Sequence, residues 1–457
     1  MDIDKEIFRA YDIRGIVDKQ LDEYTMYLIG GAIGTEVLAQ GGKSIVTGRD
    51  GRLSGSHLMK ALQLGITTTG CHVIDIGMVP TPVVYYATYA LDTNSGVMLT
   101  GSHNPPEYNG LKIVINGITL TADAIQGLYK RIKQQRIYMG RGQVTQADLT
   151  SQYITQITDR IHLANPVKLV IDCGNGVAGI TAPTLFKLLG CEVHTLYGEV
   201  DGNFPNHHPD PSIPANLTDL IATVKATNAD IGLAFDGDGD RLGVVTNEGE
   251  IIWPDRQLAL FAKDLLTRHP ASTIIYDVKC SKHVTDIIRK HGGKPLMYKT
   301  GHSFLKAKMQ ETDALLSGEM SGHIYFKERW FGFDDGAYTG ARLLEMMTQQ
   351  NISSADLFKA IPDSINTPEL KLPIQEKNKF AFMEKLLANA SFPEAEINTI
   401  DGLRVDFSDS WGLVRPSNTT PHLILRFEAD DEKGLLRIQQ LFRHMLLQLD
   451  STLGLPF

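Results

Sequence analysis

Three aspartates alternate with glycine in the stretch Asp236-Gly237-Asp238-Gly239-Asp240-Arg241. Carboxylates at alternate positions of an extended chain project to one side, and the glycines let the backbone curve so that three oxygens reach one ion. Neighbouring anions repel one another unless a cation neutralises them, and hard oxygen ligands suit Mg²⁺ or Ca²⁺. Apolar runs at 231–235 and 242–245 flank the stretch, which argues against an exposed acidic turn. We therefore predict a Mg²⁺ site at Asp236, Asp238 and Asp240.

A serine and a histidine stand side by side where another predicted strand gives way to a loop. Ser102 and His103 follow the apolar run 96–99, and Pro105 and Pro106 lie just beyond them. Each proline ends strand pairing and biases the residue before it away from helix, so the loop is held extended. We expect this loop to present Ser102 instead of burying it. A serine beside a bound Mg²⁺ can carry a phosphoryl group, because the metal offsets the charge of the phosphate.

Three other chemistries fit these loops less well. An EF-hand needs glycine and glutamate where this chain has Arg241 and Asn247. A serine hydrolase of the nucleophile-elbow type needs the pattern G-x-S-x-G, which does not surround Ser102. A Walker A loop needs a leading glycine before Gly42-Lys43-Ser44, and position 37 is valine. Metal-assisted phosphoryl transfer through Ser102 is therefore the favoured interpretation.

A third polar loop is Gly318-Glu319-Met320-Ser321-Gly322-His323. Glu319, Ser321 and His323 alternate along it, so we expect their side chains to face one way. A carboxylate beside a hydroxyl group is suited to binding the vicinal hydroxyl groups of a sugar. A polar strand end is the alternative, and the loop alone does not decide between the two.

A fourth loop, at 415–421, is rich in hydroxyl groups and carries one arginine. Arginine offers a planar fork of donors, and the turn adds hydroxyl and backbone N–H groups, which together could cradle a phosphate. The candidate residues are Arg415, Ser417, Asn418 and Thr419. A turn in which the asparagine bonds to its own backbone is the alternative.

A repeated pattern of elements must position the first three loops. Strand, helix, glycine and strand follow one another from Ser44, again from Lys168 and again from Thr273. Each unit is followed by a further strand that breaks on a polar loop and resumes. Three such units at similar spacing predict three similar α/β domains with mixed sheets. Loops at the ends of central strands are common places for chemistry, so we expect one shared site.

From about Ile365 the pattern changes. Strands are predicted at 370–374, 397–407, 411–414 and 423–428, and helices at 379–390 and 431–449, which gives a smaller α+β domain of the order βαβββα. The last helix carries an apolar face that would cover this sheet. The expected domains are 1–148 with the Ser102 loop, 149–250 with the metal loop, 251–364 with the sugar loop and 365–457 with the phosphate loop.

The composition restricts the possible partners and location. With 457 residues and a net charge of −9, the chain is too long for one core and too acidic to bind nucleic acid through general basicity. Its apolar runs stay below the roughly 18 residues that a membrane helix needs, so we predict no membrane partner and a cytoplasmic location. The four cysteines are far apart, without histidines at metal spacing, and are predicted to be buried hydrophobes.

The four loops, in this order, resemble those of the α-D-phosphohexomutase family over essentially the whole chain. TGSHNP is similar to its phosphoserine loop, DGDGDR to its metal loop, GEMSGH to its sugar loop and RPSNTTP to its phosphate loop, while FRAYDIRG at 8–15 resembles its N-terminal signature. GEMSGH is similar to the phosphomannomutase/phosphoglucomutase branch. Thr420 departs from the pattern, because many relatives have glutamate there, but the residues ahead of it match.

The resemblance implies that mannose or glucose 6-phosphate is converted reversibly into the 1-phosphate through a phosphoserine and a hexose 1,6-bisphosphate. It also implies a central cleft as the active site, one Mg²⁺ and a monomer. The implied catalytic residues are Ser102, His103, Lys112, Arg241 and His302; the implied substrate ligands are Tyr11, Arg14, Lys279, His302, Glu319, Ser321, His323, Arg415, Ser417, Asn418 and Thr419; and Ser102, through its phosphate, would join Asp236, Asp238 and Asp240 around the metal. A phosphoglucosamine mutase, a Mg²⁺-dependent sugar phosphatase and a non-catalytic sugar-phosphate-binding protein are the alternatives.

Overall fold

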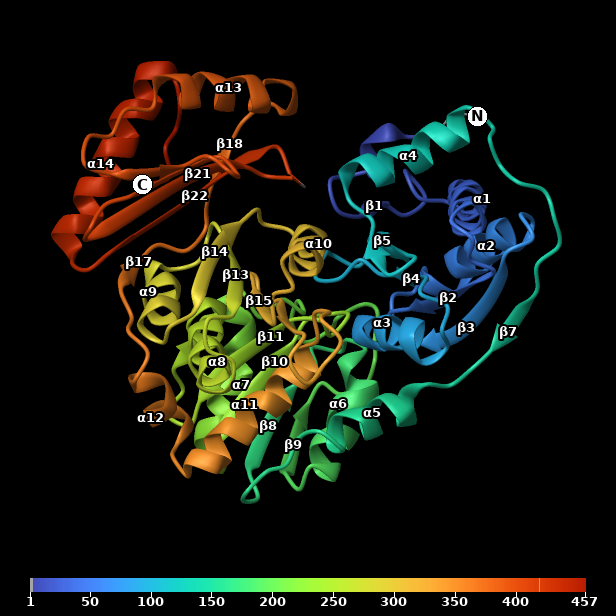
Figure 1. The fold of residues 1–457 in the computed structure, drawn as a ribbon, viewed down its shortest axis with the longest axis horizontal. Coiled ribbons are helices and arrows are strands. Elements are labelled where there is room, and N and C mark those ends of the chain that lie inside the picture. Colours follow the sequence, from blue (N-terminus) through green and yellow to red (C-terminus); the bar gives the residue numbers. More distant parts are fainter. Residues whose placement is uncertain (1–2, 419) are drawn as a thin grey trace.

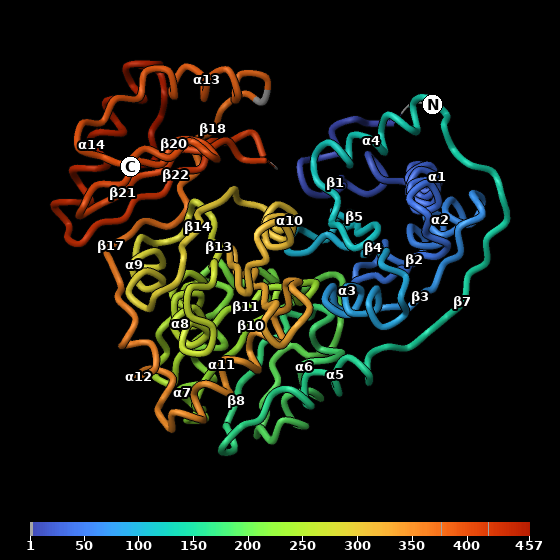
Figure 2. The backbone as a smooth tube through the Cα atoms, viewed as in Figure 1, coloured from blue at the N-terminus to red at the C-terminus, as the bar shows by residue number. Residues whose placement is uncertain are grey.

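The structure is a computed structural model, and it describes residues 3–418 and 420–457. These residues form four sheets, each accompanied by its own helices. In Figure 1 the first unit lies at the right, the second and third lie below and at the centre, and the fourth lies at the upper left. The tube in Figure 2 follows the same path and ends in the fourth unit, across the molecule from where it begins.

The first three sheets repeat one strand order. Their shared strands are β2 (Ser44–Arg49), β3 (His72–Met78), β4 (Gly96–Leu99) and β5 (Tyr108–Ile115); β8 (Lys168–Asp172), β9 (Glu192–Leu196), β10 (Ile231–Phe235) and β11 (Leu242–Thr246); and β13 (Thr273–Asp277), β14 (Lys294–Tyr298), β15 (Leu316–Gly318) and β16 (Ile324–Phe326). The orders are β5-β4-β2-β3, β11-β10-β8-β9 and β16-β15-β13-β14. In each, three strands are parallel and the outer one is antiparallel. The predicted three α/β units with mixed sheets are therefore confirmed.

The connection from the third parallel strand to its antiparallel partner occupies the same place in every sheet. In the first unit it carries Ser102, in the second it carries the three aspartates, and in the third it carries Glu319 to His323. Short strands extend these sheets: β1 (Ile13–Ile16), β6 (Ile118–Thr119) and β7 (Val144–Gln146) in the first, and β12 (Ile251–Ile252) in the second. The shared topology thus mounts three different loops at equivalent positions.

Helices lie on both faces of the three sheets, as Figure 1 shows. They are α1 (Glu23–Ala39), α2 (Gly55–Thr67), α3 (Thr81–Ala90), α4 (Ala122–Lys133), α5 (Thr150–Thr158), α6 (Ala178–Leu188), α7 (Thr218–Thr227), α8 (Pro254–Arg268), α9 (Lys282–Lys290), α10 (His302–Thr312), α11 (Gly336–Gln350) and α12 (Ser354–Lys359), with single 3₁₀ turns η1 (Lys5–Ile7) and η2 (Pro214–Leu217). Several begin at a capping side chain that satisfies a free N–H of the first turn, as Asp22 does for α1 and Asp335 for α11. None of the described helices is long and apolar enough to span a membrane.

The fourth sheet contains more strands than the sequence predicted. Its elements are β17 (Ile365–Asn366), β18 (Leu370–Pro373), α13 (Glu376–Asn389), β19 (Glu396–Asn398), β20 (Leu403–Asp406), β21 (Ser410–Pro416), β22 (His422–Ala429) and α14 (Glu432–Leu449). The single strand expected at 397–407 is two antiparallel strands, β19 and β20. Gly402 makes the reversal possible: its φ is +96°, and a Cβ there would lie 2.4 Å from the carbonyl oxygen of Val414.

The four units differ in whether they share a cluster of buried apolar side chains with their neighbours. One buried cluster runs through all of the first three units, from Val46 to Ile361. The fourth unit has its own cluster between Leu372 and Leu446, and it touches the third unit through a small apolar contact and through polar bonds such as Arg404 Nη1 to the carbonyl oxygen of Val278 at 2.7 Å. The four cysteines are buried and unpaired, as predicted. The fourth unit is therefore the one that has no share in the cluster joining the other three, although the first unit also has a second cluster of its own between Ile3 and Ile132.

Candidate active site

Ser102 is buried, which corrects the expectation that its loop presents it. Only 1 % of the residue is exposed, because the metal loop of the second unit packs directly against it. A Cβ on Gly237 would lie 2.5 Å from the carbonyl oxygen of Ser102, so only glycine permits this approach. The Ser102 hydroxyl donates to Asp236 Oδ2 at 3.0 Å and lies 3.2 Å from His103 Nδ1. Residues 101–104 also form a turn, in which the Asn104 N–H donates to the Gly101 carbonyl oxygen at 2.9 Å, in place of the extended loop that the prolines predicted.

The three aspartates of the metal loop are buried and converge. Oxygens of Asp236, Asp238 and Asp240 lie within 4.8 Å of one another. Burial and the neighbouring carboxylates raise the pKa of Asp236 and of Asp240. Burial acts in the same direction on Asp238, but the ammonium group of Lys112 outweighs it and lowers the pKa of that carboxyl. The charged forms of Asp236 and Asp240 are therefore disfavoured in these buried surroundings unless a further cation lies beside them.

This donor set fits a divalent cation. Asp238 Oδ1 and Asp240 Oδ1 are buried and have no hydrogen-bond partner among the described residues. Buried oxygens without a partner are costly, and hard carboxylate oxygens are the ligands that Mg²⁺ prefers. The residues that would hold Mg²⁺ are thus Asp236, Asp238 and Asp240, with Ser102 beside them.

Lys112 lies on β5 and joins the first unit to this cluster. Its ammonium group donates to Asp238 Oδ2 at 2.6 Å and also to Asp240 Oδ2. Although burial disfavours the charged form, these carboxylates raise its pKa above the ordinary value of a lysine. Lys112 is therefore a permanent cation beside the three aspartates, one of which binds the Ser102 hydroxyl. In the sequence, only the resemblance to the family pointed to this lysine.

The loop of the third unit meets the metal loop through His323. Arg241 Nε donates to His323 Nε2 at 3.0 Å, and His323 Nδ1 lies 3.5 Å from Asp240 Oδ1. On its other side Nδ1 lies 3.0 Å from Asp334 Oδ2. Glu319 is also buried, and its two oxygens accept from the Gly301 N–H at 2.8 Å and the Tyr325 hydroxyl at 2.7 Å. Glu319 and His323 thus bind different partners, and the shared orientation expected for Glu319, Ser321 and His323 stays a prediction.

A separate cluster of cations lies between the third and fourth units, with Lys279 in the connection after β13 and Arg415 at the start of the phosphate loop. Lys279 Nζ donates to Glu369 Oε1 at 2.6 Å, and Arg415 Nε donates to Asp401 Oδ2 at 2.9 Å. Both cations are buried and are held by acidic partners that the sequence analysis did not identify. Ser417 is buried nearby on the same loop as Arg415, Asn418 is half-buried, and Thr419 lies outside the described residues.

Three residues lie between the Ser102 loop and this cation cluster. Arg14 Nη1 donates to Asn104 Oδ1 at 2.5 Å on the Ser102 loop. Tyr11 packs edge-on against His302, with ring centres 5.6 Å apart, and it lies within electrostatic range of both Arg14 and Arg415. Burial and nearby cations hold the pKa of His302 well below its ordinary value, and neither of its ring nitrogens has a partner among the described residues. His302 is therefore neutral at pH 7, and both of its ring nitrogens are open to a partner that the described residues do not supply.

The structure brings the Ser102 loop, the metal loop and His323 into contact and places Lys279 and Arg415 in a second cluster, while the catalytic and binding roles of all predicted residues stay predictions. It also shows partners that the sequence analysis missed, which are Arg52, Lys306, Asp334, Glu369 and Asp401. The pair Asp334-Asp335 after an aromatic run was a visible signal. The others carry no local pattern, because each contacts a loop far away in the chain.

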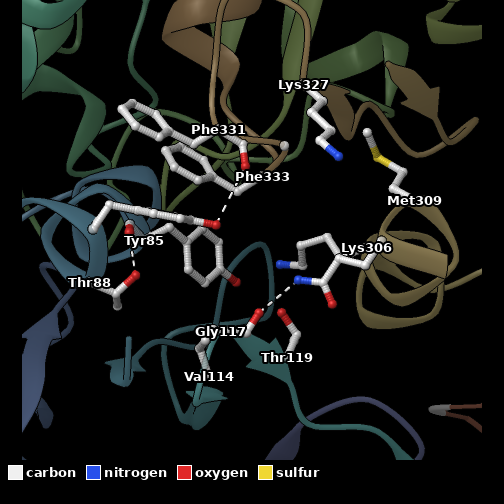
Figure 3. Close-up of a pocket in the computed structure, with 13 residues that line it drawn as sticks. Tyr85, Thr88, Val114, Gly117, Thr119, Lys306, Met309, Lys327, Phe331 and Phe333 are labelled. Carbon is white, nitrogen blue, oxygen red and sulfur yellow. Dashed lines mark hydrogen bonds between the residues drawn. The ribbon is translucent and has the colours of Figure 1, made fainter. Parts of the chain in front are cut away.

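A pocket of about 290 Å³ lies between α3, β6 and α10, outside the set of predicted residues (Figure 3). Tyr85, Phe331 and Phe333 line one part of it, and Lys306 projects from α10 toward the Tyr85 ring. Lys306 Nζ lies 4.0 Å from the centre of that ring and 2.9 Å from Asp334 Oδ1. Asp334 in turn contacts His323, so the wall of this pocket is continuous with the candidate active site.

Comparison with known proteins agrees with the four loops. The family models for phosphoglucomutase/phosphomannomutase alpha/beta/alpha domains I, II and III match residues 5–139, 151–249 and 253–365, and the C-terminal domain model matches residues 369–445. The chain is 58 % identical to a "Phosphomannomutase/phosphoglucomutase" of Pseudomonas aeruginosa over 451 residues, 99 % of this chain and 97 % of that protein. It is 51 % identical to a "Phosphoglucomutase" of Neisseria gonorrhoeae over 448 residues, 97 % of each.

A crystal structure of a phosphoglucomutase/phosphomannomutase family protein from Burkholderia thailandensis has the same fold. It superimposes with a TM-score of 0.95 at 53 % identity, covering 100 % of both chains. Together with the four matched domains and the contact between Ser102 and Asp236 of the three-aspartate loop, this shows that the chain belongs to the phosphoglucomutase/phosphomannomutase family.

Proposed function

We propose that this protein is a mutase that converts mannose 6-phosphate and glucose 6-phosphate reversibly into the corresponding 1-phosphates. The observation that carries the proposal is the contact of the Ser102 hydroxyl with Asp236 Oδ2 at 3.0 Å, at the edge of a buried cluster of three carboxylates. The named functions of the relatives described above agree with it. A separate pair of buried cations, Lys279 and Arg415, supports a second anchor for a substrate that carries phosphate at either end.

The reaction requires Ser102 to donate and recover one phosphoryl group. In the first transfer the free hydroxyl oxygen of the sugar attacks phosphorus, the bond from phosphorus to Ser102 Oγ breaks, and the hydroxyl proton passes to a base of the site. His302 is one such acceptor, because it is neutral and its nitrogens are free of partners among the described residues. The product is a hexose 1,6-bisphosphate. The reverse transfer, from the other end of that bisphosphate, restores phosphoserine and releases the isomeric monophosphate.

The chain's own charges favour this transfer. Lys112 and Arg241 lie beside the aspartates and can hold the oxygens of the moving phosphoryl group. Bound at Asp236, Asp238 and Asp240, Mg²⁺ would supply neutralisation of charge on the phosphoryl oxygens. Glu319 and Ser321, with His323 nearby, are the proposed ligands of the sugar hydroxyl groups. Tyr11, Arg14, Lys279, Arg415, Ser417, Asn418 and Thr419 are the proposed ligands around the phosphate that does not react.

The substrate has to turn over between the two transfers, because one transferring loop and one anchor serve two ends of the same sugar. We propose that the fourth unit moves to admit and enclose it, as closing lids do. Its separate core and its polar contact with the third unit support such a movement. A monomeric state and a cytoplasmic location stay predictions from the sequence.

The proposal is tested by measuring turnover of mannose 1-phosphate and glucose 1-phosphate with and without glucose 1,6-bisphosphate. We expect both to be converted to the 6-phosphates, with the bisphosphate activating any unphosphorylated enzyme. Ser102→Ala should lose most activity, while Ser95→Ala, which alters another buried serine of the first unit, should retain it. Full activity of Ser102→Ala would overturn the phosphoserine mechanism. Release of inorganic phosphate in place of the isomeric sugar phosphate would identify a phosphatase instead.

A further inference from the structure

Arg52 binds the backbone carbonyl groups of the Ser102 loop. It follows β2 in the sequence Gly48-Arg49-Asp50-Gly51-Arg52, and its side chain is fully buried. Its guanidinium group donates to four carbonyl oxygens of the loop: from Nη2 to those of Ser102 at 2.8 Å and Asn104 at 2.6 Å, and from Nη1 to those of Pro105 at 2.6 Å and Tyr108 at 2.9 Å. Nε donates to Asp50 Oδ2 at 3.1 Å. Every N–H of the arginine is therefore directed at this loop or at Asp50.

Asp50 holds the same loop from the strand side. Its Oδ2 accepts from the Thr100 hydroxyl at 2.7 Å and from the Gly101 N–H at 3.3 Å. Thr100 Oγ1 in turn accepts from the Ser102 N–H at 2.7 Å. Arg52 and Asp50 together thus satisfy the polar backbone groups on both sides of Ser102, where no regular strand or helix does so.

Ser102 needs this support because its backbone is strained. Its φ is +50°, in the left-handed region that a residue other than glycine adopts only at an energetic cost. Such a conformation persists only when surrounding contacts hold it. The carbonyl oxygen that Arg52 binds is also the one against which Gly237 of the metal loop packs. The position of this peptide therefore sets the distance from Ser102 Oγ to Asp236.

We propose that Arg52 is a positioning residue for phosphoryl transfer: it holds the Ser102 peptide in the left-handed conformation that directs Oγ at the three-aspartate loop. This role rests on the proposed phosphoserine mechanism and adds to it a residue that never touches the substrate. Lysine cannot replace Arg52, because it has three donors on one nitrogen instead of five in a planar fork. The fit is also close, since a Cβ on Gly101 would lie 2.4 Å from Arg52 Cζ.

The test compares Arg52→Lys with Arg342→Lys. Arg342 on α11 is equally buried and donates to Glu328 Oε2 at 2.7 Å, so its replacement should cost stability without touching the Ser102 loop. For Arg52→Lys we expect kcat for glucose 1-phosphate to fall about a hundredfold, the effect of misplacing a reacting group by about 1 Å, with KM changed less than about threefold. The phosphorylation of Ser102 by glucose 1,6-bisphosphate, followed by intact-protein mass, should slow by a similar factor. The ³¹P chemical shift of the phosphoserine should move only in the Arg52 variant.

A kcat within about threefold of the parent in folded Arg52→Lys, with an unchanged ³¹P shift, would overturn the proposal. So would a loss of activity in both variants that follows only the fraction of folded protein. If Arg52→Lys does not fold, Gly101→Ala decides, because its added Cβ pushes the guanidinium group from the loop while keeping every atom of Arg52. It should lower kcat with KM retained, and unchanged kcat would be contrary evidence. Wild-type turnover by Ser102→Ala would instead refute the proposed function itself.

Discussion

Replacing Glu369 by glutamine should tighten the binding of hexose phosphate. Glu369 lies between β17 and β18, at the entrance to the fourth unit, and its Oε1 accepts from Lys279 Nζ at 2.6 Å. Lys279 is one of the cations proposed to hold phosphate, so the glutamate occupies a donor that the substrate needs. Burial by itself would raise the pKa of Glu369, but Lys279, Arg415 and Arg426 lower it from 4.5 to about 2. The carboxylate is therefore a real competitor for these cations.

The size of the effect follows from this shift and from the exposure of the pair. At about 1.4 kcal/mol for each pKa unit, the shift from 4.5 to about 2 corresponds to at most about 3.5 kcal/mol. The Glu369 side chain is 37 % exposed, so solvent screens the attraction and a net value of about 1 kcal/mol is appropriate. Removing the charge while keeping the shape of the side chain should then lower the Kd of a hexose phosphate about fivefold.

The assay is calorimetric titration of glucose 6-phosphate into Glu369→Gln made in a Ser102→Ala background, so that no turnover occurs. Glu384→Gln, an equal change of charge at an exposed position of α13, is the matched control and should leave the Kd unchanged. A Kd for Glu369→Gln that equals or exceeds that of its parent would refute the reasoning, because the glutamate would then not compete with phosphate for Lys279.

The same ion pair has a pH-dependent effect on stability. Because the folded state lowers the pKa of Glu369, its contribution is fully present above about pH 4.5 and is lost as the pH falls toward about 2. Glutamine cannot titrate. The difference in unfolding free energy between the parent and Glu369→Gln should therefore shrink across this acidic range, and a difference that stays constant would contradict the assignment of the shift to this pair.

Three further outcomes can be measured directly. Lys112→Met removes the buried cation bonded to Asp238 and Asp240, so the free energy of unfolding should fall by about 3–5 kcal/mol, and MgCl₂ should raise the melting temperature of the variant more than that of the parent; equal shifts would count against a Mg²⁺ site there. Burial raises the pKa of Asp335 to about 7, so the folded state favours the neutral carboxyl and loses stability, at most about 4 kcal/mol, as the pH rises from about 4 through 7. Asp335→Asn keeps an acceptor for the first turn of α11 and should flatten that dependence in urea unfolding; an unchanged slope would oppose it. Crystals grown with and without glucose 1-phosphate should differ in the angle of the fourth unit, and identical angles would rule out its closure.

The α/β units were predictable because their signals are local. Each central strand, such as 231–235, is an apolar run bounded by a glycine-containing loop, and the same pattern returns three times. The fourth unit was harder, since 397–407 looks like one strand. Only the positive φ of Gly402 reverses the chain there, and a glycine in a sequence does not state which conformation it adopts.

Part of the site could likewise be predicted from local sequence and part could not. Carboxylates at alternate positions indicate a metal loop, and the three carboxylates converge in the structure. The burial of Ser102 could not be predicted from the sequence. Pro105 and Pro106 restrict only the Ser102 loop itself, whereas the burial is caused by the metal loop of the second unit, which packs on Ser102 through Gly237. The partners Arg52 and Glu369 lie 50 and 90 positions from the residues they bind, so no spacing rule connects them.

The support of Ser102 also bears on which part of the molecule moves during the reaction. Arg52 and Asp50 hold the Ser102 peptide through buried bonds, and the first unit shares an apolar core with the second and third, so we expect this loop to stay in place while each end of the sugar reaches it in turn. Lys279 and Arg415, by contrast, lie where the separately packed fourth unit joins the third, and their acidic partners Glu369 and Asp401 belong to that fourth unit's sheet or its connections. We therefore expect the sugar and the fourth unit to move when the bisphosphate reorients. A variant that loosens the Ser102 loop should slow the transfer step, whereas one that frees Lys279 should change how the substrate is held.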